Sequence, residues 1–121
     1  MAKDSSTKSA VNKLDPRVLE VRLAEKTLSA HKKGMDKIHP VLDILGNRRR
    51  LEVLLLLNEH TKLCVTSLCD AMNMSAPALS QHLRKMREAK VVSTKKDHKT
   101  VYYSLKKGNE EMLETVFKLI K

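Results

Sequence analysis

The segment from Ser75 to Lys90 constrains the fold most, because it combines a marked helix start, an apolar stripe and an opposite polar face. Ser75 is a good N-cap, and Pro77 fits the first turn, where a missing N–H has no intrahelical partner to lose. The apolar residues at helical spacing are Leu79, Leu83 and Met86. The polar residues left to face outward are Ser80, Gln81, Arg84, Lys85 and Arg87. We therefore expect a helix that packs one face into a core and presents the other to a partner.

A shorter helix is predicted immediately upstream, from Thr66 to Met74. Thr66 can serve as its N-cap, and the residues expected on its buried face are Leu68, Cys69 and Met72. Asn73 tolerates the left-handed backbone that a tight turn between two helices requires. Two helices joined in this way are typical of a helix-turn-helix.

The pattern changes to that of β-strands after Lys90. Residues of β-branched and aromatic type predict two strands, Val91 to Thr94 and Thr100 to Leu105, joined by a polar turn over residues 95–99. The basic residues of this turn are Lys95, Lys96, His98 and Lys99. A basic β-hairpin is thus expected directly after the polar helix.

Three sequence blocks lie in order between Val41 and Leu105, namely LGNRRRLEVLLLL, LCVTSLCDAMNMSAPALSQHLRKMREAKVV and KTVYYSL. In residues, order and spacing they resemble the winged helix-turn-helix repressors of the ArsR/SmtB family, over just over half of the chain. The resemblance implies a mainly α fold with a β-hairpin wing. It also implies a homodimer formed through the terminal helices, because those helices make the dimer in that family.

The two ends of the chain differ in character. Residues 1–14 are rich in Ser, Lys and Ala without periodicity, which predicts a flexible basic tail. Residues 15–121 are predicted to form one winged helix-turn-helix domain with N- and C-terminal dimerisation helices. The helical segments predicted around the helix-turn-helix are Asp15 to Gly34, Ile38 to Leu45, Arg48 to Glu59 and Asn109 to Ile120. The first and last of these carry apolar faces that we expect to pack on a partner.

Charge and aromatic content narrow the class of partner. The chain carries 24 Lys and Arg against 14 Asp and Glu, a formal charge of +10, and such a charge on a small chain attracts nucleic acid. With one Phe, two Tyr and no Trp it offers no aromatic platform for unpaired bases, which favours double-stranded DNA. It has no apolar run of ~20 residues to span a membrane and too few cysteines for a disulfide scaffold. We therefore expect a cytoplasmic protein with reduced thiols.

The expected DNA contacts fall into two classes. The residues expected to reach base edges in the major groove are Ser75, Ala76, Pro77, Ser80 and Gln81. Those expected to contact phosphates are Arg84, Lys85, Arg87, Lys90, Lys95, Lys96, His98 and Lys99. His82 is expected equally to contact DNA or to pack against the preceding helix. Arg48, Arg49 and Arg50 lie at a helix start, where the dipole disfavours cations, so at least one is expected to form a salt bridge within the fold.

The resemblance also raises the question of a sensory site. Family members that bind metal often carry Cys-x-Cys in the block matching Leu63 to Thr66, where this chain has Cys64 and Thr66. A Cys-plus-Thr pair is a poor soft-metal site and the terminal helix has no histidine, so we expect neither a metal site nor a cofactor. Cys64 and Cys69 remain as candidate redox residues. Cys64 is the better sensor, because a helix N-terminus stabilises a thiolate.

These observations predict a homodimeric, sequence-specific transcription regulator. We expect a repressor that binds an imperfect palindromic operator and is released by an effector that the sequence does not identify. The charge alone would also permit a constitutive architectural or nucleoid-type DNA-binding protein. An adaptor that has lost DNA binding is disfavoured by Ser80, Gln81 and the basic turn. An enzyme is disfavoured because the sequence shows no paired carboxylates, no nucleophile with a base and no glycine-rich phosphate loop.

Overall fold

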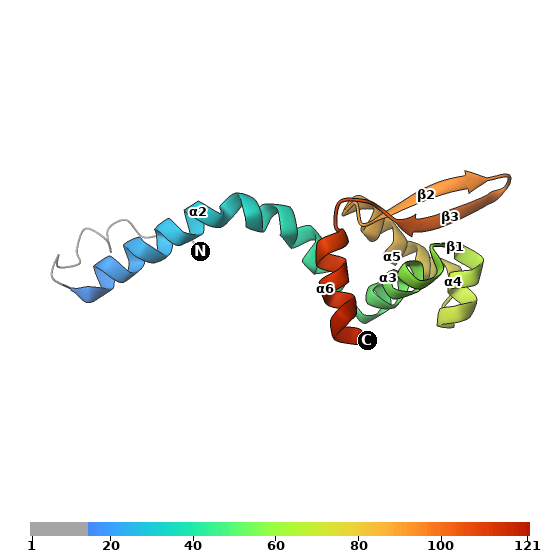
Figure 1. The fold of residues 1–121 in the computed structure, drawn as a ribbon, viewed down its shortest axis with the longest axis horizontal. Coiled ribbons are helices and arrows are strands. Elements are labelled where there is room, and N and C mark those ends of the chain that lie inside the picture. Colours follow the sequence, from blue (N-terminus) through green and yellow to red (C-terminus); the bar gives the residue numbers. More distant parts are fainter. Residues whose placement is uncertain (1–14) are drawn as a thin grey trace. The chain divides into compact units, whose positions relative to one another are not determined.

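The computed structural model describes residues 15–121, so the predicted tail over residues 1–14 lies outside the described residues. The elements in chain order are α2 (Pro16–Leu45), α3 (Arg48–His60), β1 (Lys62–Cys64), α4 (Val65–Met72), α5 (Ala76–Glu88), β2 (Val92–Asp97), β3 (Thr100–Leu105) and α6 (Glu110–Ile120) (Figure 1). The chain divides into two compact units after Ile38. The first contains most of α2, and the second contains every other element.

The helix α2 begins as predicted but does not end at Gly34. Asp15 caps it, since one of its carboxylate oxygens accepts a hydrogen bond from the Arg17 N–H at 2.9 Å. The predicted break at Gly34 is wrong, because glycine lowers helix stability by only about 1 kcal/mol relative to alanine and does not forbid the helical backbone. The helix also runs through Pro40, which has no N–H to offer to the Asp36 carbonyl.

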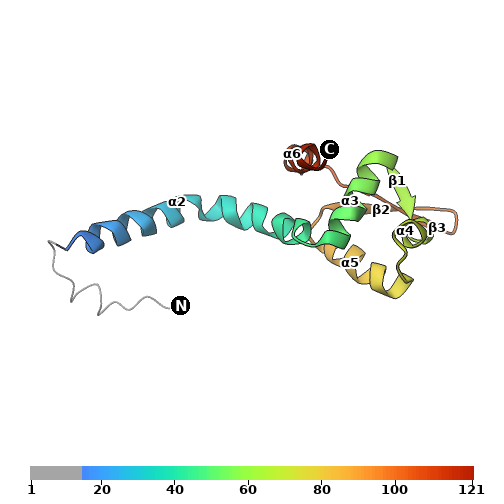
Figure 2. The same ribbon diagram turned by 90° about the horizontal axis from the view of Figure 1, so that it is seen from below.

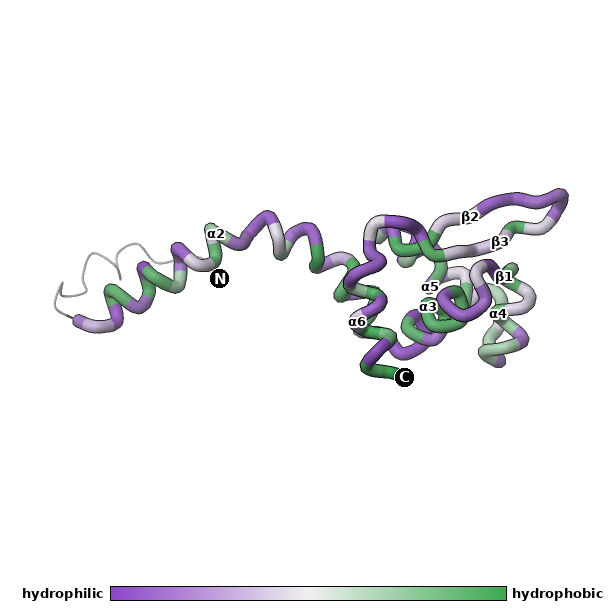
Figure 3. Tube along the Cα trace, viewed as in Figure 1, coloured by the Kyte–Doolittle hydropathy of each residue, from purple (hydrophilic) through white to green (hydrophobic). Residues whose placement is uncertain are grey.

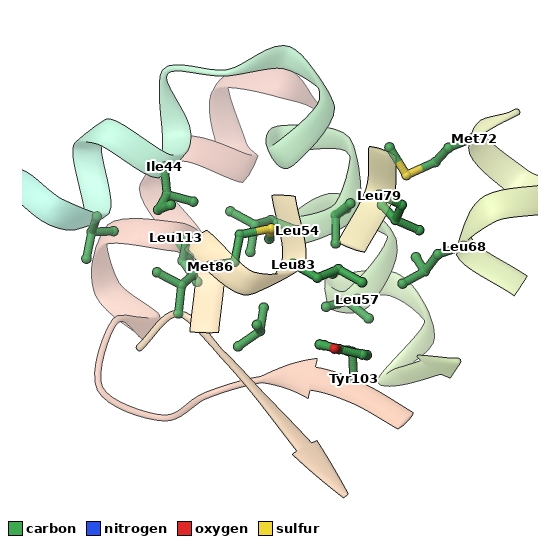
Figure 4. Close-up of a cluster of buried hydrophobic side chains, with 14 of the residues drawn as sticks. Ile44, Leu54, Leu57, Leu68, Met72, Leu79, Leu83, Met86, Tyr103 and Leu113 are labelled. Atoms are coloured by element: carbon green, nitrogen blue, oxygen red, sulfur yellow. The ribbon is translucent and has the colours of Figure 1, made fainter. Parts of the chain in front are cut away.

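The core of the second unit is aliphatic and is built around α3. Figure 2 shows α3 between α5 and α6. The predicted apolar stripe of α5 is buried as expected, and Figure 4 shows Leu83 and Met86 in one cluster with Leu54 and Leu57 of α3. The residues that line this core are Val41, Ile44, Val53, Leu54, Leu57, Leu68, Met72, Leu79, Leu83, Met86, Val91, Val92, Tyr103, Leu113 and Phe117.

The three strands form an antiparallel sheet in the order β1-β3-β2. The predicted strand ending at Thr94 is too short, because β2 continues to Asp97, where Asp97 pairs with Thr100 across a two-residue turn. Ladder hydrogen bonds to β3 outweigh the low strand propensity of the lysines in this stretch. The strand β1 was not predicted; it has only three residues and pairs with Ser104 to Tyr102 of β3.

The terminal helix α6 contributes to the core of its own chain. Leu113 and Phe117 are buried, and Leu113 belongs to the cluster in Figure 4. The expectation that the apolar face of this helix awaits a partner is therefore wrong for these two side chains. Leu119 and Ile120, at the end of the helix, are exposed.

The arrangement of a helix-turn-helix followed by a β-hairpin confirms the predicted mainly α, winged helix-turn-helix fold. None of the helices between residues 15 and 121 is long and apolar enough to cross a membrane.

Candidate nucleic-acid interface

The turn between α4 and α5 is tight and has the backbone that the sequence predicts. Asn73 adopts the left-handed conformation, with φ 52° and ψ 52°. The N–H of Met74 then donates to the Cys69 carbonyl at 3.0 Å, which satisfies a free group at the end of α4. At the other end of α4 the predicted cap at Thr66 is wrong: the N-cap is Cys64, because β1 runs directly into the helix.

Both ends of α5 are held by local hydrogen bonds. The Ser75 hydroxyl accepts from the Ala78 N–H at 3.3 Å, which confirms the predicted N-cap. At the C-terminus, Lys90 has φ 60°, and the N–H groups of Lys90 and Val91 donate to the carbonyls of Arg87 and Met86. This is a Schellman termination, which fixes the direction in which the chain enters the wing.

The face of α5 opposite the core is fully available to a partner. Every predicted base-reading residue is exposed: Ser75, Ala76, Pro77, Ser80 and Gln81. The predicted cations Arg84, Lys85 and Arg87 are exposed as well. Glu88, which lies four residues after Arg84 on the same face, is also exposed and adds a negative charge near the C-terminus of the helix. The N-terminal turns are thus the part of α5 best suited to approach a polyanion.

His82 differs from the other candidates on α5 because it is partly buried. Burial lowers its pKa, and the neighbouring positive charges of Arg50, Lys85 and Arg49 lower it further. The imidazole therefore lies close to the start of α3. The Nε and one terminal nitrogen of Arg50 are buried there and find no hydrogen-bond partner among the described residues.

The other two arginines at the start of α3 are paired within the fold. Arg48 and Arg49 bind the carboxylate of Glu52 at 3.1 and 3.0 Å, which confirms the expected salt bridge. The hydrogen bond from Arg49 is the main cause of a lowered pKa at Glu52, and the one from Arg48 adds to it. Arg49 also donates to the Met72 carbonyl at 3.3 Å and so ties α3 to the end of α4.

The wing presents cations at its tip. Figure 3 shows that the outer part of β2 and the turn are hydrophilic, whereas β3 carries a short hydrophobic stretch near the turn. Its exposed basic side chains are Lys95, Lys96, His98 and Lys99. Among them lies Asp97, whose carboxylate is 3.6 Å from the His98 ring. His98 holds a left-handed backbone, with φ 56°, at the first position of the turn.

A further cation at the wing was missed by the sequence analysis. Lys62 on β1 lies over the Tyr102 ring, with its Nζ 4.8 Å from the ring centroid. Because β1 is too short to give a strand pattern, no sequence signal placed Lys62 beside β3. The pairing of β1 with β3 thus places the exposed Lys62 beside the β2–β3 hairpin, which carries the other exposed lysines.

The two cysteines have different surroundings. The Cys64 sulfur lies 3.3 Å from the Ser67 hydroxyl at the N-terminus of α4. Hydrogen bonds from that hydroxyl and from the Ser67 N–H lower the pKa of the Cys64 thiol. Cys69 packs against the core, and both thiols are free. Among residues 15–121 no group of three or more His, Cys, Asp or Glu side chains is arranged to hold a metal ion.

Residues 47–94, from the cap of α3 into β2, match the model of the family described as bacterial regulatory protein, arsR family. The arsenical resistance operon repressor of Escherichia coli is 42% identical over 62 residues, which are 51% of this chain and 53% of that protein. The chain thus spans about half the length of that repressor.

Two other relatives match more of their own length. The transcriptional activator HlyU of Vibrio cholerae is 33% identical over 97 residues, covering 79% of this chain and 89% of that protein. Reduced HlyU superimposes with a TM-score of 0.70 over 76% of this chain and 97% of HlyU. The homodimeric winged helix-turn-helix DNA-binding domain of Mb0332 from Mycobacterium bovis is 25% identical, with a TM-score of 0.62 over 74% of this chain and 81% of that chain.

Proposed function

Because the chain belongs to the arsR family of bacterial regulatory proteins, we propose that it acts as a homodimeric transcriptional repressor that binds operator DNA through α5 and the wing. Membership of this family of DNA-binding transcription regulators also confirms the expectation that the chain is not an enzyme. Repression rather than activation is proposed because the relative with the highest identity given above is named an operon repressor, whereas HlyU is named an activator.

The observation that carries the proposal is the continuous exposure of polar and basic side chains on α5 and β2. The exposed face of α5 begins at a capped N-terminus, which is where short side chains of an inserted helix reach base edges. Ser80 and Gln81 lie one and a half turns further along this face, and Gln81 can pair bidentately with adenine. We assign base reading to these residues and to Ser75, Ala76 and Pro77.

Phosphate contact is assigned to the cations that flank this face. Arg84, Lys85 and Arg87 are on α5 and lie at or beside its exposed face, while Lys95, Lys96, His98 and Lys99 are on the wing. Such contacts fix the position of the protein on the duplex and make binding depend on salt without reading sequence. His82 is assigned a packing role against the start of α3, because it is partly buried beside Arg50.

The symmetry of a dimer predicts the form of the operator. Two copies related by a two-fold axis present two α5 helices to half-sites roughly 34–36 Å apart or a multiple of this spacing. The operator is therefore proposed to be an imperfect palindrome. Selection of bound sequences from a random duplex library tests this directly. Enrichment of inverted half-sites supports the proposal, whereas binding without any enriched sequence would favour the architectural alternative that the charge of +10 permits.

We propose that a thiol-reactive signal acts at Cys64, with Cys69 as the resolving thiol. The support is the lowered pKa of Cys64, which is the N-cap of α4 and has its sulfur 3.3 Å from the Ser67 hydroxyl. Peroxide should then lower the operator affinity of the native chain several-fold and leave Cys64→Ser unaffected, as a binding titration would show. Release of DNA with both thiols intact by mass spectrometry would refute this role.

A further inference from the structure

A small hollow lies between α6, the end of α3 and the loop that follows β3. Its volume is about 200 Å³, and it is open to solvent. The apolar side chains that line it are Leu105, at the end of β3, and Leu113 and Phe117 on α6. Since a cavity of about 150 Å³ holds a benzene molecule, the hollow has room for one ring-sized apolar group.

Charges of both signs surround this hollow. Lys106 and Lys107 come from the loop after β3, and Glu110 and Glu114 come from one face of α6. Glu110 is already engaged, because its carboxylate accepts a hydrogen bond from the Gly108 N–H at 2.7 Å. The positive charge of Lys107 also stabilises that carboxylate.

The other polar groups at the rim have no partner of their own. The side chains of Lys106, Glu114 and Asn58 form no hydrogen bond or ion pair with any residue between 15 and 121. The charges of Lys106 and Glu114 are opposite, so an anion in the hollow would be repelled by the carboxylate and a cation by the ammonium. A molecule that carries both charges would instead find a partner for each.

We propose that this hollow binds a small zwitterion with an apolar body, which is the chemistry of an apolar amino acid, and that the bound molecule lowers the affinity for operator DNA. The apolar body lies against Leu113 and Phe117, the carboxylate faces Lys106 and the ammonium faces Glu114. An apolar floor with a few polar groups at its edge is the usual form of a small-molecule site. The regulatory part of the proposal rests on the operator binding proposed above, whereas the binding part does not.

The rim of the hollow is tied to the end of α5 by two hydrogen bonds. The Lys106 N–H donates to the Val91 carbonyl at 2.9 Å. The side-chain amide of Asn109 donates to the Lys90 carbonyl at 3.3 Å. Lys90 and Val91 form the termination of α5 that directs the chain into the wing.

These two ties connect the hollow to the surface proposed to bind DNA. A ligand that draws the Lys106 side chain over the hollow acts on the same loop that holds Lys90 and Val91. The wing and α5 contact one duplex together only in one relative position, so a shift at this turn weakens their joint binding. The coupling is reciprocal, and operator DNA must therefore lower the affinity for the ligand by the same factor.

Calorimetric titration of the full-length chain with L-phenylalanine as the probe tests the binding part. Three relatives of the probe each lack one group: hydrocinnamate has no ammonium, phenethylamine has no carboxylate and L-alanine has no ring. L-phenylalanine should bind several-fold more tightly than each of them. Equal affinity for L-phenylalanine and hydrocinnamate would overturn the zwitterion, and absence of L-phenylalanine binding would overturn the site.

Charge-removing variants test which residues face the ligand. Glu114→Gln should abolish the preference for L-phenylalanine over hydrocinnamate, and Lys106→Gln should weaken binding of both compounds several-fold. Glu111→Gln and Lys118→Gln remove the same charges from α6 outside the hollow and should change neither affinity. All four side chains are exposed, so none of these variants disturbs the core. Equal effects of the hollow variants and their matched controls would overturn the assignment.

Titration of operator DNA with and without saturating L-phenylalanine tests the regulatory part. Operator affinity should fall several-fold in the native chain. Asn109→Ala removes one tie to α5 without removing a side-chain cap of α6, so it should bind L-phenylalanine normally and show a smaller fall. Unchanged operator affinity with L-phenylalanine bound would overturn the regulation and leave the proposed function standing. A ligand-free chain that does not prefer operator over random duplex would contradict the proposed function instead.

Discussion

At the scale of single residues, the site is defined by which side chains the core leaves free. On α5, Leu79, Leu83 and Met86 fill the core, so the exposure of Ser80 and Gln81 follows from helical periodicity alone. His82 could not be assigned in this way, because it lies at the border of the two faces. Its partly buried position depends on tertiary structure, because Arg50, which lies beside it, is more than thirty residues earlier in the chain.

The lowered pKa of His82 makes folding stability depend on pH. Because the folded chain holds this imidazole neutral more strongly than the unfolded chain does, the unfolded chain binds more protons around the ordinary histidine pKa of about 6.5. Stability should therefore be full above that pH and fall as the pH drops through it, levelling off below the folded pKa. Urea titrations between pH 5 and 8 should show that the free energy of unfolding falls less steeply with decreasing pH in His82→Gln than in the native chain. The substitution His60→Gln, at an exposed histidine, controls for the loss of a histidine. The same pH dependence of the free energy of unfolding in His82→Gln and in the native chain would contradict this explanation.

At the scale of elements, local signals predicted some boundaries and long-range pairing decided the rest. Ser75 and Asn73 mark the ends of their helices through hydrogen bonds that span three to five residues, so a short window of sequence was sufficient. The length of β2 depends on β3, and β1 exists only because Tyr102 to Ser104 offers it a partner. The burial of Leu113 likewise depends on α3 and α5, which are remote in sequence, and therefore a face that looked unpartnered proved to be core.

Gly34 and Gly108 both have open space around the Cα but differ in backbone conformation, and substitutions at them test the description of the elements. A Cβ at Gly34 would meet no atom within 4 Å, so Gly34→Ala should raise the helical signal of α2 and stabilise it by up to about 1 kcal/mol. Gly108 has φ 122°, which L side chains rarely adopt, so Gly108→Ala should lower the free energy of unfolding by about 1 kcal/mol or more. Circular dichroism during urea unfolding checks both. A loss of helix in Gly34→Ala would show that α2 ends there after all.

The wing supplies a prediction about salt. Lys95 and Lys96 are exposed on β2 and are proposed to bind phosphates, so each substitution by alanine should weaken binding to all duplexes alike. The slope of log K against log salt should flatten by up to about one unit for each lysine removed. Lys33→Ala, at an exposed lysine of α2, is the matched control for the loss of one charge. An unchanged slope in the wing variants would show that the hairpin does not touch phosphate.

At the scale of the whole molecule, the proposed function requires that one set of side chains reads the bases and a different set contacts the phosphates. Non-specific attraction follows from a charge of +10 and needs no particular fold. Sequence preference needs the capped start of α5 to present short polar side chains to base edges. The central claim is therefore that Ser80 and Gln81 carry specificity while the surrounding cations carry affinity.

The most direct measurement is a titration of the native chain, Ser80→Ala and Gln81→Ala against the selected operator and against random duplex of equal length at one salt concentration. Loss of a good base contact costs about 1–3 kcal/mol, so each variant should bind the operator roughly 5- to 150-fold more weakly and random DNA almost as well as before. Ser29→Ala, at an exposed serine on α2, controls for the loss of a surface hydroxyl. Equal weakening on operator and random DNA, or none on either, would contradict the assignment of α5 as the element that reads sequence.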